Sequence, residues 1–208
     1  MTLRVVAYNG RWLFTALVHS LKISVTNIAV RGVTLLANEL YVLRVGRKSS
    51  DVAVYDTGFF SLERRLNVPG LRAACDMAAC ERARCLFIAD RATGMVHKVD
   101  GNGVGSQWPV GDKARGIAVT PEGHLLVTCF VRRQLRMFTA DGLLVRDIDL
   151  PDDVTCPWHA VKLADHDRFV VFHGSTKDAG YQLSVWTVPH FLRFWKNEST
   201  KAFRAILV

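Results

Sequence analysis

The chain has 208 residues, of which 50% are hydrophobic and 22% are charged, and its formal net charge is +8. A hydrophobic fraction this high suffices for one sizeable core and excludes an intrinsically disordered chain. The longest unbroken apolar stretch is far shorter than the roughly 20 residues that a membrane-spanning helix needs, which excludes a helical membrane protein.

The first 30 residues contain two short apolar runs, residues 3–8 and 12–18, with Asn9 and Gly10 between them. Asn-Gly is the favoured two-residue turn of a β-hairpin, so we expect these runs to pair as outer strands of an incomplete sheet. No small-residue cleavage site follows a continuous apolar core, which makes the segment a poor signal peptide.

From residue 31 onward one pattern recurs at a period of about 40 residues: four strand-length apolar runs divided by hairpin-length turns. The clearest unit, residues 115–155, has predicted strands at 117–120, 125–130, 134–139 and 143–149. The other units are residues 31–70, 71–114 and 156–188. Their predicted strands are 33–36, 39–43, 52–56 and 61–68; 75–79, 86–90, 95–99 and 106–110; and, in the last unit, 168–172 and 181–188.

The units align in their turns as well as in their strands. The run LFIAD from Leu86 aligns with LLVTC from Leu125, and the chain from Trp158 aligns with the chain from Arg115 without a gap. An ordinary β-sandwich also has short strands at regular spacing, but it has no reason to repeat its turn chemistry in the same order. The sequence therefore predicts an all-β protein, a β-propeller of about four recognisable four-stranded blades.

Three stretches then resemble proteins of a known type: DMAACERARCLFIADRATGMVHKVDGNG from Asp76, the unit from Arg115 to Asp153, and WHAVKLADHDRFVVFHG from Trp158. They are similar to the six-bladed β-propeller proteins of NHL type, over roughly residues 70 to 175. The resemblance implies a ring of six blades, whereas this chain supplies four blades and an N-terminal segment. We therefore expect either an incomplete propeller, which would expose a blade face and a blade edge, or a ring that closes with fewer blades.

Residues 189–208 differ in character from the repeats because they are basic and aromatic and contain no blade turns. Phe191, Phe194 and Trp195 occur at helical spacing, which favours a helical tail covering the last blade over an amphipathic helix on a membrane surface.

The five cysteines, an odd number without a secretion signal, favour a reducing compartment, and hence a cytoplasmic location over a secreted one. Cys80 and Cys85 flank a four-residue turn and could face one another. They form a candidate disulfide if the chain is exported, and buried free thiols if it is not.

Enzymatic chemistry has weak support in the sequence. His159 begins a predicted innermost strand, where an NHL-like lyase would hold a metal, but the aligned positions are Gly116 and Met77. A metal-dependent hydrolase of this fold would need acidic and amide residues that converge on the channel. Asp76 and Asp90 are the only acids near the inner strands of their blade, and the other units have Arg115 and Cys129 in the corresponding places. We expect both carboxylates to accept hydrogen bonds from backbone donors at strand ends, and we expect no bound cofactor.

The positive charge lies mainly at the chain ends. Residues 1–70 carry nine Lys or Arg against four Asp or Glu, residues 189–208 carry four against one, and residues 71–188 carry fourteen of each. Some NHL propellers bind RNA through a basic rim, but such a rim would need basic residues at equivalent loop positions with stacking aromatics beside them.

We therefore predict a non-enzymatic platform that binds a protein partner, with RNA binding and a metal-dependent lyase or hydrolase as alternatives. Propellers bind through loops at one rim, where every blade contributes a turn. The candidate rim consists of the chain entering each first strand and the turn between the second and third strands. Its predicted residues are Arg72, Arg91, Arg115, Arg132, Arg133, Trp158 and Lys177.

Overall fold

The computed structural model describes residues 2–5, 21–24, 28–47, 49–164, 167–175 and 180–188, with the backbone alone described for the first two segments. Throughout these residues the regular structure is β-strand, in seventeen strands that form five antiparallel sheets. Within the same residues, no helix is long and apolar enough to cross a membrane.

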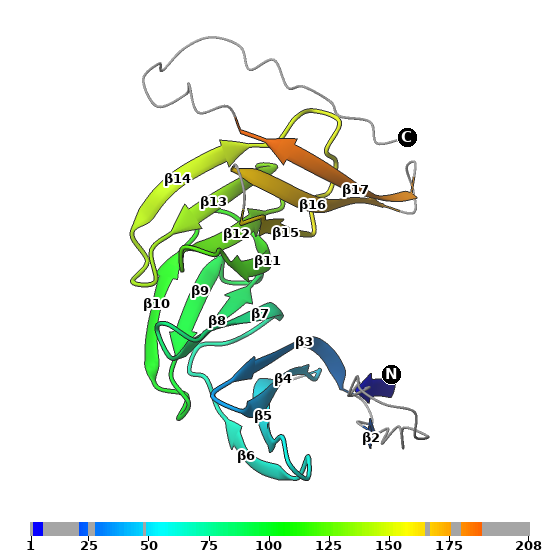
Figure 1. Ribbon diagram of the computed structural model, residues 1–208, viewed down its shortest axis with the longest axis vertical. Coiled ribbons are helices and arrows are strands. Elements are labelled where there is room, and N and C mark those ends of the chain that lie inside the picture. Colours follow the sequence, from blue (N-terminus) through cyan, green and yellow to red (C-terminus); the bar gives the residue numbers. More distant parts are fainter. Residues whose placement is uncertain are drawn as a thin grey trace, which may run out of the picture.

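Four sheets follow one another along an open arc and form the blades of a β-propeller, numbered here blades 1 to 4 (Figure 1). In each blade consecutive strands pair, from an innermost strand on the concave side to an outermost strand on the convex side. Blade 1 comprises β3 (Ala29–Leu36), β4 (Glu39–Val45), β5 (Ser50–Asp56) and β6 (Leu62–Leu66). Blade 2 comprises β7 (Ala74–Cys80), β8 (Cys85–Asp90), β9 (Met95–Val99) and β10 (Gly105–Pro109). Blade 3 comprises β11 (Ala114–Val119), β12 (Leu125–Cys129), β13 (Gln134–Phe138) and β14 (Leu144–Asp149), and blade 4 comprises β15 (His159–Lys162), β16 (Arg168–Ser175) and β17 (Gly180–Thr187).

The fold class predicted from the repeats is confirmed, and the strands expected in residues 115–155 correspond to β11–β14. The predicted N-terminal pairing stays a prediction. The strand β1 (Thr2–Val5) pairs with β2 (Leu21–Ser24), whereas the expected partner, residues 12–18, lies outside the described residues. The predicted helical tail, residues 189–208, also lies outside them.

The gapless alignment of blades 3 and 4 fails after the first strand. Val119 of β11 pairs with Leu125, whereas Lys162 at the equivalent position of β15 pairs with Phe169. The β15–β16 turn is therefore one residue longer than the β11–β12 turn. Side chains alternate between the two faces of a strand. Because of the extra residue, each side chain of β16 therefore lies on the face of the sheet opposite to the one that the gapless alignment predicts.

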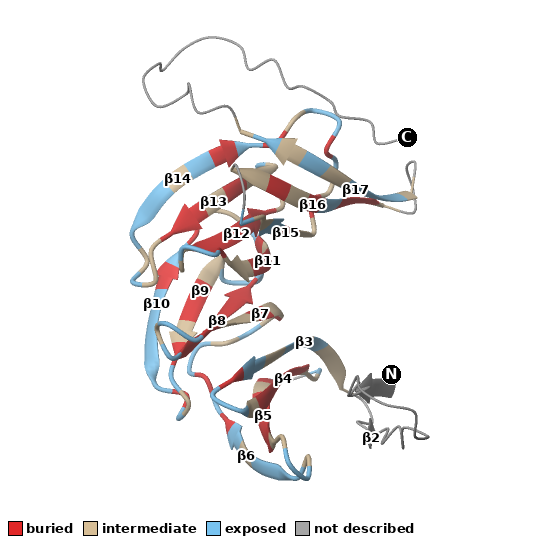
Figure 2. Cartoon of the chain, viewed as in Figure 1, coloured by how far each residue is buried: buried red, intermediate tan, exposed pale blue. Residues whose placement is uncertain are grey.

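The second strands of blades 2 and 3 are buried on both faces, because a neighbouring blade packs on each side (Figure 2). Every residue of β8 and of β12 is buried, whereas the outermost strand β14 is largely exposed. One apolar cluster lies between each two neighbouring blades. Its large members are Tyr41 and Ile88 between blades 1 and 2, Phe87 and Ile117 between blades 2 and 3, and Leu126 and Phe169 between blades 3 and 4. Burial of this kind is the main favourable contribution to folding.

The innermost strands contact one another in order, β3 with β7, β7 with β11, and β11 with β15. Glycine permits two of these approaches: a Cβ on Gly32 would lie 3.0 Å from Met77, and a Cβ on Gly116 would lie 2.4 Å from the Trp158 carbonyl oxygen. The pairing register shifts at the same position of three innermost strands, immediately before Gly32, Asp76 and Gly116.

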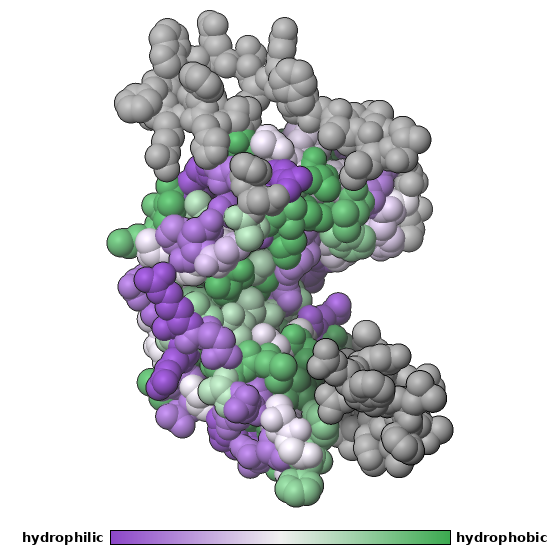
Figure 3. Space-filling view, viewed as in Figure 1, coloured by the Kyte–Doolittle hydropathy of each residue, from purple (hydrophilic) through white to green (hydrophobic). Residues whose placement is uncertain are grey.

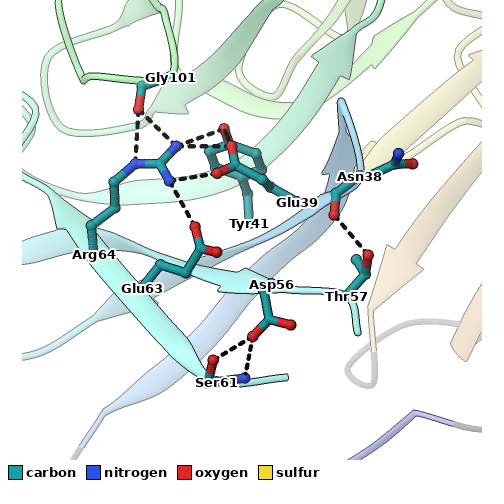
Figure 4. Close-up of polar contacts among 9 residues, drawn as sticks. All are labelled: Asn38, Glu39, Tyr41, Asp56, Thr57, Ser61, Glu63, Arg64 and Gly101. Atoms are coloured by element: carbon teal, nitrogen blue, oxygen red, sulfur yellow. Dashed lines mark hydrogen bonds and ion pairs between the residues drawn. The ribbon is translucent and has the colours of Figure 1, made fainter. Parts of the chain in front are cut away.

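Polar contacts also join the blades. Arg64 of β6 pairs with Glu39 of β4 and donates from Nη2 to the carbonyl oxygen of Gly101 in the β9–β10 turn, at 3.1 Å (Figure 4). The Arg64 guanidinium lowers the pKa of Glu39 to about 2. Burial, together with the adjacent Glu39 carboxylate, raises the pKa of Tyr41 to about 12.

A second set of contacts lies on the face formed by the turns between first and second strands. Glu81 of blade 2 accepts a hydrogen bond from the backbone N–H of Ala37 in blade 1, and Arg82 donates to the backbone carbonyl of Glu122 in blade 3. The carboxylate of Glu122 pairs with Lys162 of blade 4, which lowers the pKa of Glu122 to about 2. This face therefore links all four blades through acids that already have partners.

Gly116→Ala should destabilise the protein, because the added methyl group has no space between β11 and β15. We expect a loss of about 1–3 kcal/mol in the free energy of unfolding, measured by urea denaturation. Gly58→Ala is the matched control, since its Cβ would lie at an ordinary 3.4 Å from Asp56. Equal stability of the two variants would show that the close approach has no energetic role.

Stability should fall as the pH falls below about 6.5, the ordinary pKa of histidine in an unfolded chain. Burial lowers the pKa of His97, and that of His173, so the folded protein binds protons less readily than the unfolded chain. His97→Gln should reduce the loss of unfolding free energy between pH 7.5 and 5.5 in urea titrations. An unchanged pH dependence in this variant would contradict the assignment.

Candidate functional site

One face of the arc is built from the segments that enter the innermost strands and from the turns between second and third strands, and we call it the entry rim. In blades 2 and 3 a backbone hydrogen bond joins this turn to the entering segment, and in blade 4 one joins the end of β16 to the entering segment. The donor and acceptor pairs are Arg91 N and Ala73 O, Phe130 N and Lys113 O, and Gly174 N and Thr155 O.

Buried or partly buried carboxylates hold the entry rim in shape. Asp90 is 0% exposed, and its carboxylate accepts hydrogen bonds from four backbone N–H groups. These donors belong to Arg72, Ala73, Ala92 and Thr93. Asp112 does the same in blade 3, where its Oδ2 accepts from the N–H groups of Val131 and Arg132. The acids of the rim thus satisfy backbone donors, as expected for Asp90.

The junction of blades 3 and 4 carries a cation–π arrangement on this rim. The Arg115 guanidinium carbon lies 3.7 Å from the ring centroid of Trp158 and 5.2 Å from that of Phe130. The two rings meet edge to face at 6.2 Å. Trp158 is fixed from the other side, because its Nε1 donates to the Gly174 carbonyl at 2.8 Å. A guanidinium over an aromatic face is stabilised by the ring quadrupole, by about 0.5–1 kcal/mol at an exposed site.

Tyr181 extends this arrangement toward solvent. Its ring meets Trp158 edge to face at 6.2 Å and stacks on Phe172 at 5.5 Å, and Tyr181 is 53% exposed. We call Arg115, Phe130, Trp158 and Tyr181 the rim cluster. It combines a stacked cation with an exposed aromatic ring, which is a common composition for binding surfaces.

Further positive charge lies near the rim cluster. Burial lowers the pKa of Arg115, and the charges of Arg91 and Arg31 lower it further. Arg31 directly precedes Gly32 just as Arg115 directly precedes Gly116, so the two arginines occupy the same place in β3 and β11. Among the described residues, none of these three arginines forms an ion pair.

A second polar arrangement crosses three innermost strands. Oδ2 of Asp76 in β7 accepts a hydrogen bond from the backbone N–H of Ile117 in β11 at 2.9 Å and one from Nδ1 of His159 in β15 at 2.8 Å. Gly116 leaves the space between Asp76 and His159 open, because a Cβ there would lie 3.0 Å from His159 Nδ1. Asp76 thereby connects blade 2 with blade 4.

The structure brings together only some of the residues predicted for the rim. Arg115 and Trp158 are in contact, and Arg72 and Arg91 both lie beside Asp90, exposed to solvent. Arg132 is exposed beside Asp112, and Arg133 pairs with Asp152 at 3.2 Å. Lys177 lies outside the described residues.

The remaining candidates have structural surroundings. His159 is held by Asp76, and within the described ranges no group of three potential metal ligands converges. Cys80 and Cys85 are directly opposite in the β7–β8 hairpin, and both are buried free thiols. Burial raises the pKa of Cys85 to about 11.

Phe130, Tyr181 and Arg31 were not among the predicted rim residues. Phe130 had been assigned to the end of a strand, and a pattern signal existed for Arg31, since both Arg31 and Arg115 are followed by glycine. Nothing in the sequence indicates that Tyr181 contacts Trp158, because that contact depends on the pairing of β16 with β17.

No family model matches the chain, and no curated protein matches it. Solved structures do resemble it. Hydrazine synthase of Kuenenia stuttgartiensis is 16% identical with a TM-score of 0.62, over 84% of this chain and 49% of that one. A chain of the nidogen/laminin complex is 13% identical with a TM-score of 0.61, over 81% and 69%. The inactive H270A virginiamycin B lyase of Staphylococcus aureus, solved with quinupristin, is 11% identical with a TM-score of 0.59, over 91% and 60%. This chain thus spans about half the length of the first of these structures, and at such identities the likeness extends to the fold alone.

Asp76→Ala should destabilise the protein by about 1–3 kcal/mol, because the Ile117 N–H would lose its acceptor in a partly buried position. Asp76→Asn keeps an oxygen at that place and should lose less. The comparison is made by urea denaturation. If both variants were as stable as the parent, Asp76 would not couple the blades.

Proposed function

We propose that this chain is a binding module of NHL-like propeller type that holds a protein partner at its entry rim, without catalysing a reaction. The observation that carries the proposal is the rim cluster, in which a cation is stacked on Trp158 and the neighbouring Tyr181 is 53% exposed. Aromatic and arginine side chains are the residues most enriched at the energetic centres of protein interfaces.

The surroundings of the cluster support recognition by a rigid surface. Trp158 is held by the Gly174 carbonyl, and the turns of the rim are fixed by Asp90 and Asp112. A surface whose side chains are held before binding loses little conformational freedom when a partner arrives. One similar fold comes from the nidogen/laminin complex and another from virginiamycin B lyase, so the fold itself accommodates both protein complexes and catalysis.

The proposal includes a larger ring. The face of blade 4 that points away from blade 3 exposes apolar side chains at Val161, Phe172, Leu183 and Val185. A hollow separates the two ends of the arc, with apolar surface on the sheets above it (Figure 3). A further blade would pack on this face as blades 2 to 4 pack on their predecessors. Tyr181 lies on this same face, next to the rim, because it pairs with Gly174 at the hairpin end of the sheet and stacks on Phe172.

Site-specific photo-crosslinking tests the proposed function. A benzophenone amino acid replacing Tyr181 should give protein adducts in lysate of the source organism, and excess unlabelled protein should suppress them. The same replacement at Phe59, which is 90% exposed in the β5–β6 turn, is the matched control. Equal adducts at both positions would refute a partner site at the rim, and adducts destroyed by ribonuclease would point to RNA instead.

A further inference from the structure

We infer that the rim cluster, together with Arg31 and Arg91, binds a carboxylate supplied by an acidic peptide segment of the partner. This inference rests on the proposed function and adds the chemistry that the partner must present. Its elements are the geometry of Arg115, the neighbouring arginines that form no ion pair with a described residue, and the apolar surface of Tyr181.

The way Arg115 is held leaves its hydrogen-bonding groups free. A guanidinium is flat, and its five N–H donors lie in its plane. The Arg115 Cζ atom lies 3.7 Å from the Trp158 centroid, which is too close for an N–H edge to point at the ring, so stacking uses the face of the guanidinium. Among the described residues, no side chain accepts a hydrogen bond from this guanidinium. The free edge matches a carboxylate, which can accept two parallel N–H bonds.

The nearby acids keep their charge but form no ion pair with these arginines, because their oxygens accept hydrogen bonds from other donors. Asp76 accepts from Ile117 and His159, and Asp90 accepts from four backbone N–H groups. Arg31 and Arg91 are exposed and Arg115 is partly buried, and none of the three forms an ion pair with a described residue. A bound anion would relieve the repulsion between these arginines.

Tyr181 determines what should follow the carboxylate. Its ring lies next to Trp158 and backs onto Phe172, and more than half of it is exposed. An apolar side chain next to the acidic residue would bury this exposed ring. The site therefore fits an acidic residue with an apolar residue close to it in the peptide.

The same geometry disfavours a single-stranded nucleic acid, which needs several open ring faces for stacked bases. Arg115 covers one face of Trp158, and Phe172 stacks against Tyr181. Tyr181 thus keeps one ring face for a base. The phosphates of a nucleic acid could contact the arginines, but its bases would find no series of open aromatic rings on which to stack.

Selection from a random twelve-residue phage-displayed peptide library tests the inference. Enriched peptides should share an Asp or Glu beside an apolar residue. A synthetic peptide of that sequence should bind by isothermal titration calorimetry, and its Asn or Gln counterpart should bind at least ten-fold more weakly. Arg115→Gln and the double variant Arg31→Gln/Arg91→Gln should each weaken binding at least ten-fold. Arg65→Gln, at an exposed arginine of β6, should leave it unchanged.

The outcomes separate this inference from the proposed function. Enriched peptides without an acidic residue, but still sensitive to Arg115→Gln, would overturn the inference and leave the rim as a protein site. No enriched peptide and no crosslink at position 181 would overturn both. An oligouridylate that bound more tightly than the peptides and competed with them would replace the peptide by RNA. Thermal unfolding of each variant establishes that it is folded.

Discussion

The structure depends on one constraint: each of the four blades is apolar on both faces, so each must be covered by another sheet. The central strands β8 and β12 are buried along their whole length, and no single blade could bury them alone. Stacking brings the innermost strands together, and Gly32 and Gly116 give the backbone the space to approach. The direct contacts between blades, including the link from Asp76 to His159, follow from this approach.

The two faces of the arc use their charges differently. On the face with the turns between first and second strands, Glu81 and Glu122 pair with groups of neighbouring blades. On the entry rim, Asp90 and Asp112 instead accept from backbone N–H groups, and so leave arginine side chains without partners. Residues 71–188 are neutral by count, and at the rim Arg133 pairs with Asp152, whereas Arg91 and Arg115 form no ion pair with a described residue. A positive binding surface can therefore arise from a balanced sequence.

The sequence predicted what depends on local pattern. Apolar runs and turn residues located the strands of blades 1 to 3, and alignment of the units located Arg115 and Trp158 at the rim. The sequence did not predict the contacts that depend on the register of strand pairing. One added residue in the β15–β16 turn changed the faces of β16, and the contact between Asp76 and His159 joins residues 83 positions apart. Tyr181 reaches Trp158 only through the pairing of β16 with β17.

Function in this fold is set by a few positions that the fold leaves free to vary. Gly32, Asp76, Gly116 and His159 occupy the corresponding position in the innermost strands of blades 1 to 4. The residues directly before that position are, in the same order, Arg31, Cys75, Arg115 and Trp158. Cys75 donates to the Ala114 carbonyl and has its thiol pKa raised to about 12 by burial, so it serves the junction between blades. Arg115 and Trp158 stack on each other instead. The backbone is equivalent at these places, and the side chains differ. Structures that share only 11–16% identity with this chain can therefore share its fold while presenting a different chemistry at the same rim.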